Sequence, residues 1–212
     1  MAGRRRLQPS RTTDEGVTLS RIFLAGASGV IGRSLTPLLA HAGHTVGGMT
    51  RSHTKTAELQ ALGAEPIVVD VFNKLELLAA VDRFQPDIII NELTDLPDDP
   101  SRLTEHASLN ARIRAEGNDT LIAAARRAGV DRFLAQSVAW EFPAGSNRYG
   151  VTVLERTVLE FGGVVLRYGR LYGPGTFYEN ALPHEPRVSV QRAAERTAEL
   201  LEHPTGAILI TD

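Results

Sequence analysis

Cysteine is absent from this chain of 212 residues. Without thiols, disulfide bonds, thiolate metal sites and cysteine nucleophiles are all excluded. No apolar run approaches the roughly 20 residues that a membrane-spanning helix needs. The net charge of −2 gives no electrostatic reason to expect nucleic acid or an anionic membrane as the main partner. We therefore expect a cytoplasmic protein whose partner is a small-molecule substrate, with no nucleic acid and no membrane.

Metal-binding patterns are absent as well, and acidic residues are scarce near the N-terminus. The six histidines show neither the H-x-x-x-H nor the H-E-x-x-H spacing, so we expect no metal site. Residues 1–20 carry four arginines and almost no apolar residues. We interpret them as a disordered basic extension before a domain that spans residues 21–212. A transit peptide or a basic anchor is the alternative for this extension.

A glycine-rich turn near the start of the domain organises the rest of the sequence. The apolar run 22–25 predicts a buried strand, and three glycines spaced three residues apart follow it, before an apolar helical pattern. Such a turn places unpaired backbone N–H groups and the positive end of a helix dipole around an anion. The pattern predicts a diphosphate site, the alternative being a glycine-rich turn that binds nothing. The residues expected at this site are Gly26, Ser28, Gly29, Val30, Ile31 and Gly32.

Short apolar runs and amphipathic stretches then alternate along the chain. Strands are predicted at 22–25, 44–49, 66–69, 87–90, 132–136, 164–166 and 207–210, and helices at 30–39, 55–62, 75–84, 103–128, 153–161 and 190–201. This alternation is typical of an α/β fold in which a doubly wound parallel sheet has helices on both faces. The sequence length is enough for one sizeable core.

Several motifs, taken in order, resemble one known family. They are the glycine turn 26–32, Arg51-Ser52, Val69-Asp70, Asn110 with the helix 120–130, Ser137, and above all Leu166-Arg167-Tyr168-Gly169-Arg170-Leu171-Tyr172-Gly173-Pro174-Gly175. Together they resemble the extended and atypical short-chain dehydrogenase/reductases, the NAD-dependent epimerase/dehydratase family. The resemblance covers roughly residues 21–212. It implies a Rossmann core that binds a dinucleotide at the carboxyl ends of its strands.

The expected cofactor follows from the end of the second strand. An acid there would hydrogen-bond a ribose 2′-hydroxyl, whereas an arginine can pair with a 2′-phosphate. Thr50, Arg51 and Ser52 include no acid, so we expect NADP(H), with NAD possible, and with Arg51 as the main contact and Ser52 as a secondary one. Asp70 should lie beside the adenine. Val71 and Leu93, after the third and fourth strands, complete the expected cofactor-binding residues.

The resemblance also implies a catalytic group, which this chain matches only in part. The family pairs a serine or threonine after the fifth strand with Tyr-x-x-x-Lys, where the lysine lowers the pKa of the tyrosine. Ser137 and Tyr149 are the matching candidates, but Val153 stands where the lysine is expected. Ser137 as a structural strand-end serine and Tyr149 as a surface tyrosine are the alternatives.

Two further departures leave the function open. Only residues 176–187 separate the Tyr-Gly-Pro-Gly turn from the next helix, so most of the C-terminal substrate lid of the family is absent from this sequence. The helices 103–128 and 153–161 correspond to those that, by resemblance, form a homodimer interface. We expect an NAD(P)-dependent oxidoreductase or epimerase/dehydratase that acts on a small carbonyl, hydroxyl or sugar substrate. A non-catalytic sensor of NADP(H) is the alternative.

Overall fold

The computed structural model describes residues 11–12, 18–97 and 99–212. Its strands are β1 Arg11–Thr12, β2 Thr18–Leu19, β3 Arg21–Ala25, β4 Thr45–Thr50, β5 Ala64–Val68, β6 Ile88–Asn91, β7 Arg132–Val138, β8 Val164–Tyr168, β9 Arg170–Tyr172, β10 Arg187–Ser189 and β11 Gly206–Ile210. Its α-helices are α1 Val30–His41, α2 Thr56–Ala61, α3 Lys74–Phe84, α4 Ala107–Arg112, α5 Asn118–Ala128, α6 Ser146–Phe161 and α7 Val190–Glu199. Shorter helical turns are η1 His53–Lys55, η2 Pro100–Arg102 and the π-helical η3 Ile113–Gly117.

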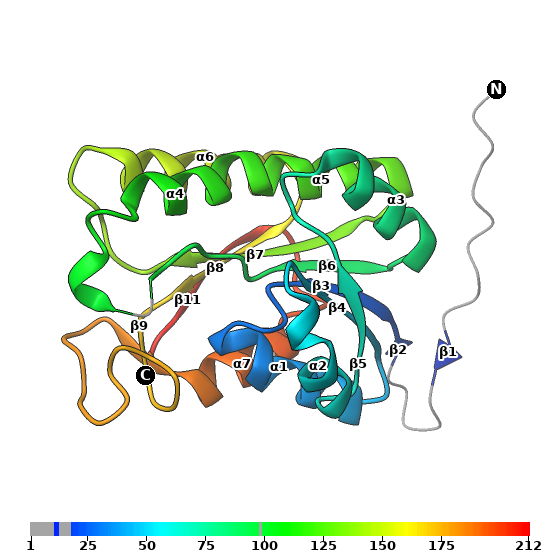
Figure 1. Ribbon diagram of the computed structural model, residues 1–212, viewed down its shortest axis with the longest axis horizontal. Helices are drawn as coiled ribbons and strands as arrows, with labels where there is room; N and C mark the ends of the chain where they lie inside the picture. The colour runs from blue at the N-terminus through cyan, green and yellow to red at the C-terminus, as the bar shows by residue number, and fades with distance from the viewer. Residues whose placement is uncertain (1–10, 13–17, 98) are drawn as a thin grey trace.

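Seven parallel strands form the main sheet, in the order β11-β8-β7-β6-β3-β4-β5. The chain starts near the middle at β3, runs outward through β4 and β5, and then returns to β6 on the other side of β3 (Figure 1). Such a reversal creates a crevice at the carboxyl ends of β3 and β6, where this type of sheet binds its ligands. The predicted doubly wound parallel sheet is confirmed.

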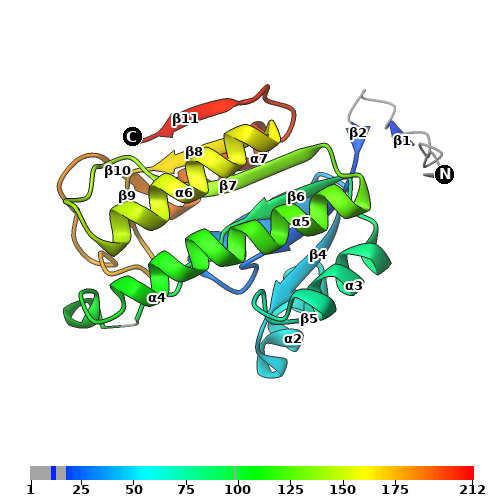
Figure 2. The same cartoon turned by 90° about the horizontal axis from the view of Figure 1, so that it is seen from above.

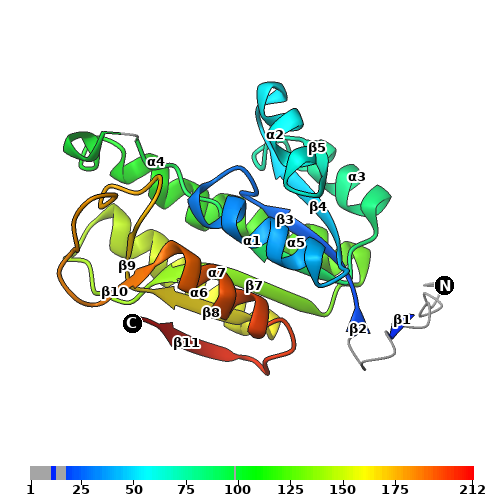
Figure 3. The same cartoon turned by 90° about the horizontal axis from the view of Figure 1, so that it is seen from below.

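Helices cover both faces of the sheet, as the continuous apolar strands require. Figures 1 and 2 show α3, α4, α5 and α6 on one face, and Figure 3 shows α1, α2 and α7 on the other. Each layer has its own buried cluster: Leu24, Ile31 and Leu35 belong to the one under α1 and α7, and Phe23 and Leu121 belong to the one under α5. In the part of the chain that the structure describes, no helix is long and apolar enough to cross a membrane.

Two details of the helices differ from the sequence prediction. The stretch 107–128 is helical, but a π-helical turn, η3, interrupts it. Helix α6 begins at Ser146, seven residues before the predicted start, so that it includes Tyr149. The sequence pattern did not indicate this first part of the helix, because Gly150 within it is a poor helix former. Gly150 is needed because a Cβ there would lie 2.7 Å from Cα of Ala111, where α6 crosses α4.

Two other regions bear on the predicted organisation. The expectation of a disordered extension over 1–20 falls largely outside the described residues; of this stretch, β1 and β2 pair as antiparallel strands. The chain leaves the main sheet at Gly169, after β8. The short strands β9 and β10 beyond it pair in parallel. That pair was not predicted, because three-residue strands carry too little pattern to be recognised in a sequence.

Candidate functional site

The glycine turn between β3 and α1 is as tight as its spacing predicts. Gly26 adopts a φ of +86°, which disfavours any side chain, and a Cβ there would lie 2.7 Å from the carbonyl oxygen of Glu92. A Cβ on Gly32 would lie 2.3 Å from the carbonyl oxygen of Gly26, so the first turn of α1 packs directly on the turn before it. Gly29 differs, because its φ of −80° is ordinary and a Cβ would meet only the Gly26 oxygen, at 3.1 Å.

The start of α1 presents free backbone donors. Gly29 N–H donates to the oxygen of Gly26 and Arg33 N–H to that of Gly29, whereas the N–H groups of Val30, Ile31 and Gly32 meet no acceptor in the described part of the chain. No acidic residue lies in the first turn to compete for them. These donors and the helix dipole favour an anion at this position. The residues present therefore fit the diphosphate of a dinucleotide.

A cavity of about 200 Å³ opens beside this turn, at the carboxyl ends of β3, β4 and β6. Seven of the predicted cofactor-binding residues line it: Gly26, Ser28, Gly29, Arg51, Asp70, Val71 and Leu93. Met49, Thr50, Val69, Phe72, Glu92, Thr94 and Ile113 also line the cavity, and sequence reasoning missed them. Ser52 lies beside it; its N–H donates to the Thr50 hydroxyl and its Oγ contacts Thr54 Oγ1. The predicted residues thus gather at one site.

Arg51 and Asp70 are the charged side chains of the predicted cofactor-binding set that line this cavity. Arg51 has 68% of its side chain exposed, and its Nη2 lies 3.5 Å from Asp95 Oδ1, a long contact with a half-buried carboxylate. Asp70 Oδ1 accepts a hydrogen bond from the N–H of Phe72. Arg51 is therefore held only loosely, and it is free to turn toward an anion in the cavity.

The carboxyl end of β7 carries a second polar group. The Ser137 hydroxyl donates to Glu155 Oε1 at 2.6 Å, and Arg167 donates to both oxygens of the same carboxylate, at 2.9 and 2.5 Å. Ser137 itself is 1% exposed. Its hydroxyl hydrogen is thus committed to a carboxylate that a bidentate arginine fixes in place.

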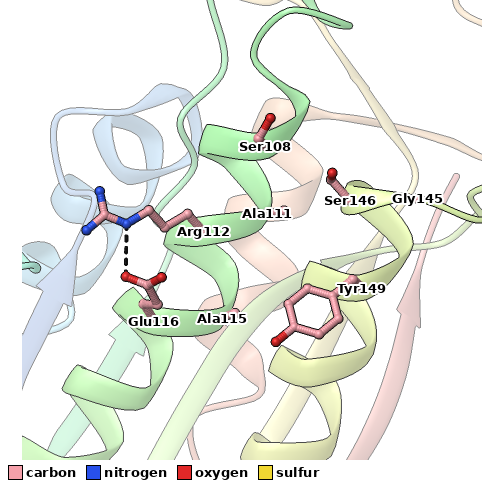
Figure 4. Close-up of a pocket in the computed structure, with 8 residues that line it drawn as sticks. All are labelled: Ser108, Ala111, Arg112, Ala115, Glu116, Gly145, Ser146 and Tyr149. Atoms are coloured by element: carbon pink, nitrogen blue, oxygen red, sulfur yellow. Dashed lines mark hydrogen bonds and ion pairs between the residues drawn. The ribbon is translucent and has the colours of Figure 1, made fainter.

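Tyr149 lies elsewhere. Figure 4 shows its ring in the groove between α4 and α6, which also contains the ion pair of Arg112 with Glu116. Tyr149 and Glu155 are six residues apart on one helix, so they point about 120° apart around its axis. Tyr149 is 63% exposed. Among the described residues, no hydrogen bond joins it to Ser137, whose hydroxyl donates to Glu155. The catalytic roles of Ser137 and Tyr149 stay predictions.

Two buried charged residues went unnoticed in the sequence. Glu92 ends the apolar run of β6, is 5% exposed, and accepts a hydrogen bond from the Tyr168 hydroxyl at 2.9 Å. Burial raises the pKa of Glu92 to about 8. Arg114, in the π turn, is 4% exposed, and burial lowers its pKa to about 10. The signals available for them were an acid directly after a strand that is apolar up to Ile90, and an arginine that recurs at a spacing of four residues with Asn110 and Asn118.

A family model decides the classification. The model described as "NAD dependent epimerase/dehydratase family" matches residues 22–158. The chain belongs to this family. The matched segment begins in β3 and ends within α6. It therefore contains the glycine turn 26–32, which we call the cradle, as well as the cavity and Ser137.

A curated relative is longer than this chain. A Streptomyces protein named "3-diazoavenalumate denitrifying reductase" is 35% identical to it, over 74% of this chain and 58% of that protein. The chain thus spans less than two thirds of the length of this relative.

Solved structures confirm the Rossmann architecture. The enzyme WbmG of Bordetella bronchiseptica, solved in complex with NAD, superposes with a TM-score of 0.73 at 20% identity, over 92% of this chain and 73% of that one. UDP-glucose 4-epimerase of Thermus thermophilus, also with NAD, gives 0.74 at 20% identity, over 90% and 77%. At this level of identity, the likeness concerns the fold alone.

Proposed function

We propose that this chain binds NADP(H) at the cradle of Gly26, Gly29 and Gly32 and acts as an NAD(P)-dependent reductase. The observation that carries the proposal is the group of three unpaired N–H donors at the start of α1, beside a cavity that leads to Arg51 and Asp70. Donors, helix dipole and cavity all suit the diphosphate and adenosine parts of a dinucleotide. The reduced cofactor, when bound, supplies a hydride.

The choice of NADP(H) over NAD(H) rests on charge at the end of β4. Arg51 lines the cavity there, and no acidic residue lies among residues 49–52 to accept from a ribose 2′-hydroxyl. An arginine whose only described charge partner is a carboxylate 3.5 Å away can exchange it for a 2′-phosphate at little cost.

The substrate class we propose is one that accepts a hydride without needing a proton. Ser137 donates its hydrogen to Glu155, and Tyr149 lies in the groove between α4 and α6, which supports a reaction in which Tyr149 does not protonate a substrate oxygen. The Streptomyces relative is named as a denitrifying reductase of a diazo compound. An aromatic diazonium group suits such a site: hydride forms the new C–H bond, the C–N bond breaks, and N₂ leaves with the bonding pair.

One observation favours a second function, that of a non-catalytic NADP(H) sensor. The Ser137 hydroxyl is committed to Glu155, Tyr149 lines the groove between α4 and α6, and Val153 stands where the family has its lysine, which supports this second function. Such a protein would bind the dinucleotide at the cradle with no turnover.

Cofactor binding and turnover separate these possibilities. The full chain is titrated with NADPH by fluorescence, and NADPH consumption is then followed with benzenediazonium and, separately, with benzaldehyde. The proposal expects binding, loss of binding in Gly29→Val, and consumption with the diazonium ion well above that of Gly29→Val. Binding with no consumption for either compound favours the sensor. An absence of NADPH binding overturns the proposed function altogether.

A further inference from the structure

Arg114 is a buried cation with unused hydrogen-bond donors. It is 4% exposed, and its Nε and Nη1 meet no acceptor in the described part of the chain. A buried guanidinium whose donors lack acceptors loses hydration without the hydrogen bonds that would offset the loss. Sites of this kind persist where a ligand supplies the missing acceptors.

The polar side chains one helical turn before and after Arg114 have hydrogen-bond partners. Asn110, Arg114 and Asn118 recur every four residues, and all three are buried. Asn110 Oδ1 accepts from the N–H of Asp95, and Asn118 joins the side chains of Asn91 and Thr157. Arg114, between them, is thus the member of this polar stripe whose side chain has donors left over.

The π turn that carries Arg114 lies at the ligand-binding edge of the sheet. Ile113, one residue earlier, lines the dinucleotide cavity. On the other side, the charge that most supports the guanidinium is that of Glu155, which holds Ser137 at the end of β7 and Arg167 at the end of β8. With two arginines and one carboxylate, this group has an excess positive charge. Single π turns within α-helices occur frequently at functional sites.

The path of a bound dinucleotide can be followed across this edge. Its adenosine part belongs over β3, β4 and β5, where Arg51 and Asp70 line the cavity, and its diphosphate belongs at Gly29. Its nicotinamide half must therefore extend to the opposite side of the crevice, over β6, β7 and β8. Glu155 and its partners lie on that side, and Arg114 is close enough for the charge of Glu155 to act on its guanidinium.

Position 153, where the family has a lysine, is a valine in this chain, so another cation is needed beside the nicotinamide half of the cofactor. Arg156, on the same helix, is not a substitute, because its side chain is 63% exposed and lies 3.9 Å from Glu160 on the outer surface. We infer that Arg114 donates hydrogen bonds to uncharged oxygen atoms of the nicotinamide half of the dinucleotide, such as ribose hydroxyls or the carboxamide oxygen. Arg114, in the π turn η3 between α4 and α5, thereby provides the positive charge that the family's lysine would provide at position 153. This inference rests on the proposed function.

Two ligands distinguish the nicotinamide half from the rest of the cofactor. NADPH contains it, whereas adenosine 2′,5′-bisphosphate has only the adenosine and its phosphates. Arg114→Met should weaken NADPH by about ten- to hundredfold, the loss expected for hydrogen bonds from a charged donor, and should change bisphosphate affinity less than about twofold. Arg127→Met is the control, since Arg127 lies on α5 with 61% of its side chain exposed and pairs with Asp82 of α3, and it should change neither affinity.

The Tm of the variants separates a binding role of Arg114 from a structural one. If Arg114 served only to stabilise the fold, its replacement would lower the Tm. Removing a buried, unpaired cation should raise the Tm of Arg114→Met, whereas Arg114→Lys, which keeps the charge, should retain more NADPH affinity than Arg114→Met. Equal changes for both ligands, no change for either, or a lower Tm or misfolding of Arg114→Met would overturn this inference alone. Failure of the unmodified chain to bind either ligand would overturn the proposed function and the inference with it.

Discussion

The Tyr168 hydroxyl donates a hydrogen bond to Glu92 Oε1 at 2.9 Å across 76 positions of the sequence. Tyr168 is also 2.5 Å from the hydroxyl of Thr197 in α7, so three buried side chains join β6, β8 and α7 beneath the cavity. The second oxygen of Glu92, Oε2, is buried and has no hydrogen-bond partner among the residues that the structure describes. A neutral carboxyl suits this environment far better than a charged one.

The stability of the fold should therefore depend on pH through Glu92. Burial raises its pKa from 4.5 to about 8. Between these values the unfolded chain has released the proton that the folded chain keeps, so the Glu92 contribution to the unfolding free energy falls as pH rises. The slope is about 1.4 kcal/mol per pH unit, and it ends above pH 8. Chemical denaturation at pH 5 to 8 measures it, and Glu92→Gln should flatten the curve and stabilise the fold at pH 8.

An exposed acid provides the control for this measurement. Glu160 has 63% of its side chain exposed, so Glu160→Gln should leave the curve almost unchanged. A Glu92→Gln protein with the same pH dependence as the unmodified chain would contradict a neutral, buried Glu92.

The glycines of the cradle should separate folding from binding. Gly32→Ala places a Cβ 2.3 Å from a backbone oxygen, so it should lower the unfolding free energy by about 2 kcal/mol or more. Position 29 has a backbone conformation that valine can adopt, and a Cβ there meets a single atom, the Gly26 oxygen, at 3.1 Å. It should keep the fold within about 1 kcal/mol and abolish NADPH binding, as denaturation and fluorescence titration together would show. Unchanged NADPH affinity in a folded Gly29→Val protein would contradict the phosphate cradle.

Arg51 should set the preference between the two dinucleotides. Because its side chain is 68% exposed and its contact with Asp95 is 3.5 Å long, Arg51→Ala should cost little stability. It should weaken NADPH about ten- to hundredfold and NADH less than about threefold, since only NADPH carries a phosphate to pair with. Titration of both cofactors checks this, with the exposed Arg148→Ala as control. Equal losses for NADPH and NADH would count against the assignment.

Tyr149 offers a direct test of the catalytic pair expected from the sequence. Because it lies in the groove between α4 and α6, Tyr149→Phe should leave turnover of any accepted substrate within about twofold, and Val153→Lys should not raise it. Ser137→Ala should lower turnover, because Glu155 loses a hydrogen bond that holds it at the end of β7. Initial rates with NADPH measure all three variants. A large loss in Tyr149→Phe would instead show that Tyr149 reaches the substrate.

Much of the fold and part of the site could be predicted from local patterns. The seven strands of the main sheet lie where apolar runs predicted them, within a few residues, because burial on both faces demands continuous apolar sequence. The start of α6 was missed because Gly150 marks a close helix crossing with Ala111, a contact between residues 39 positions apart. Arg114 was missed because a charged residue on a helix is ordinarily solvated.

The amino-acid sequence by itself determined the cradle, because its geometry depends on three glycines, one strand and one helix that are adjacent in the chain. It likewise determined the alternation of strands and helices and hence the doubly wound sheet. Only the tertiary structure decided which polar groups meet: Ser137 pairs with Glu155 and Glu92 with Tyr168, whereas Nε and Nη1 of Arg114 meet no acceptor among the described residues. The physical reason is that the cost or gain of burying such groups depends on partners that folding brings from distant elements.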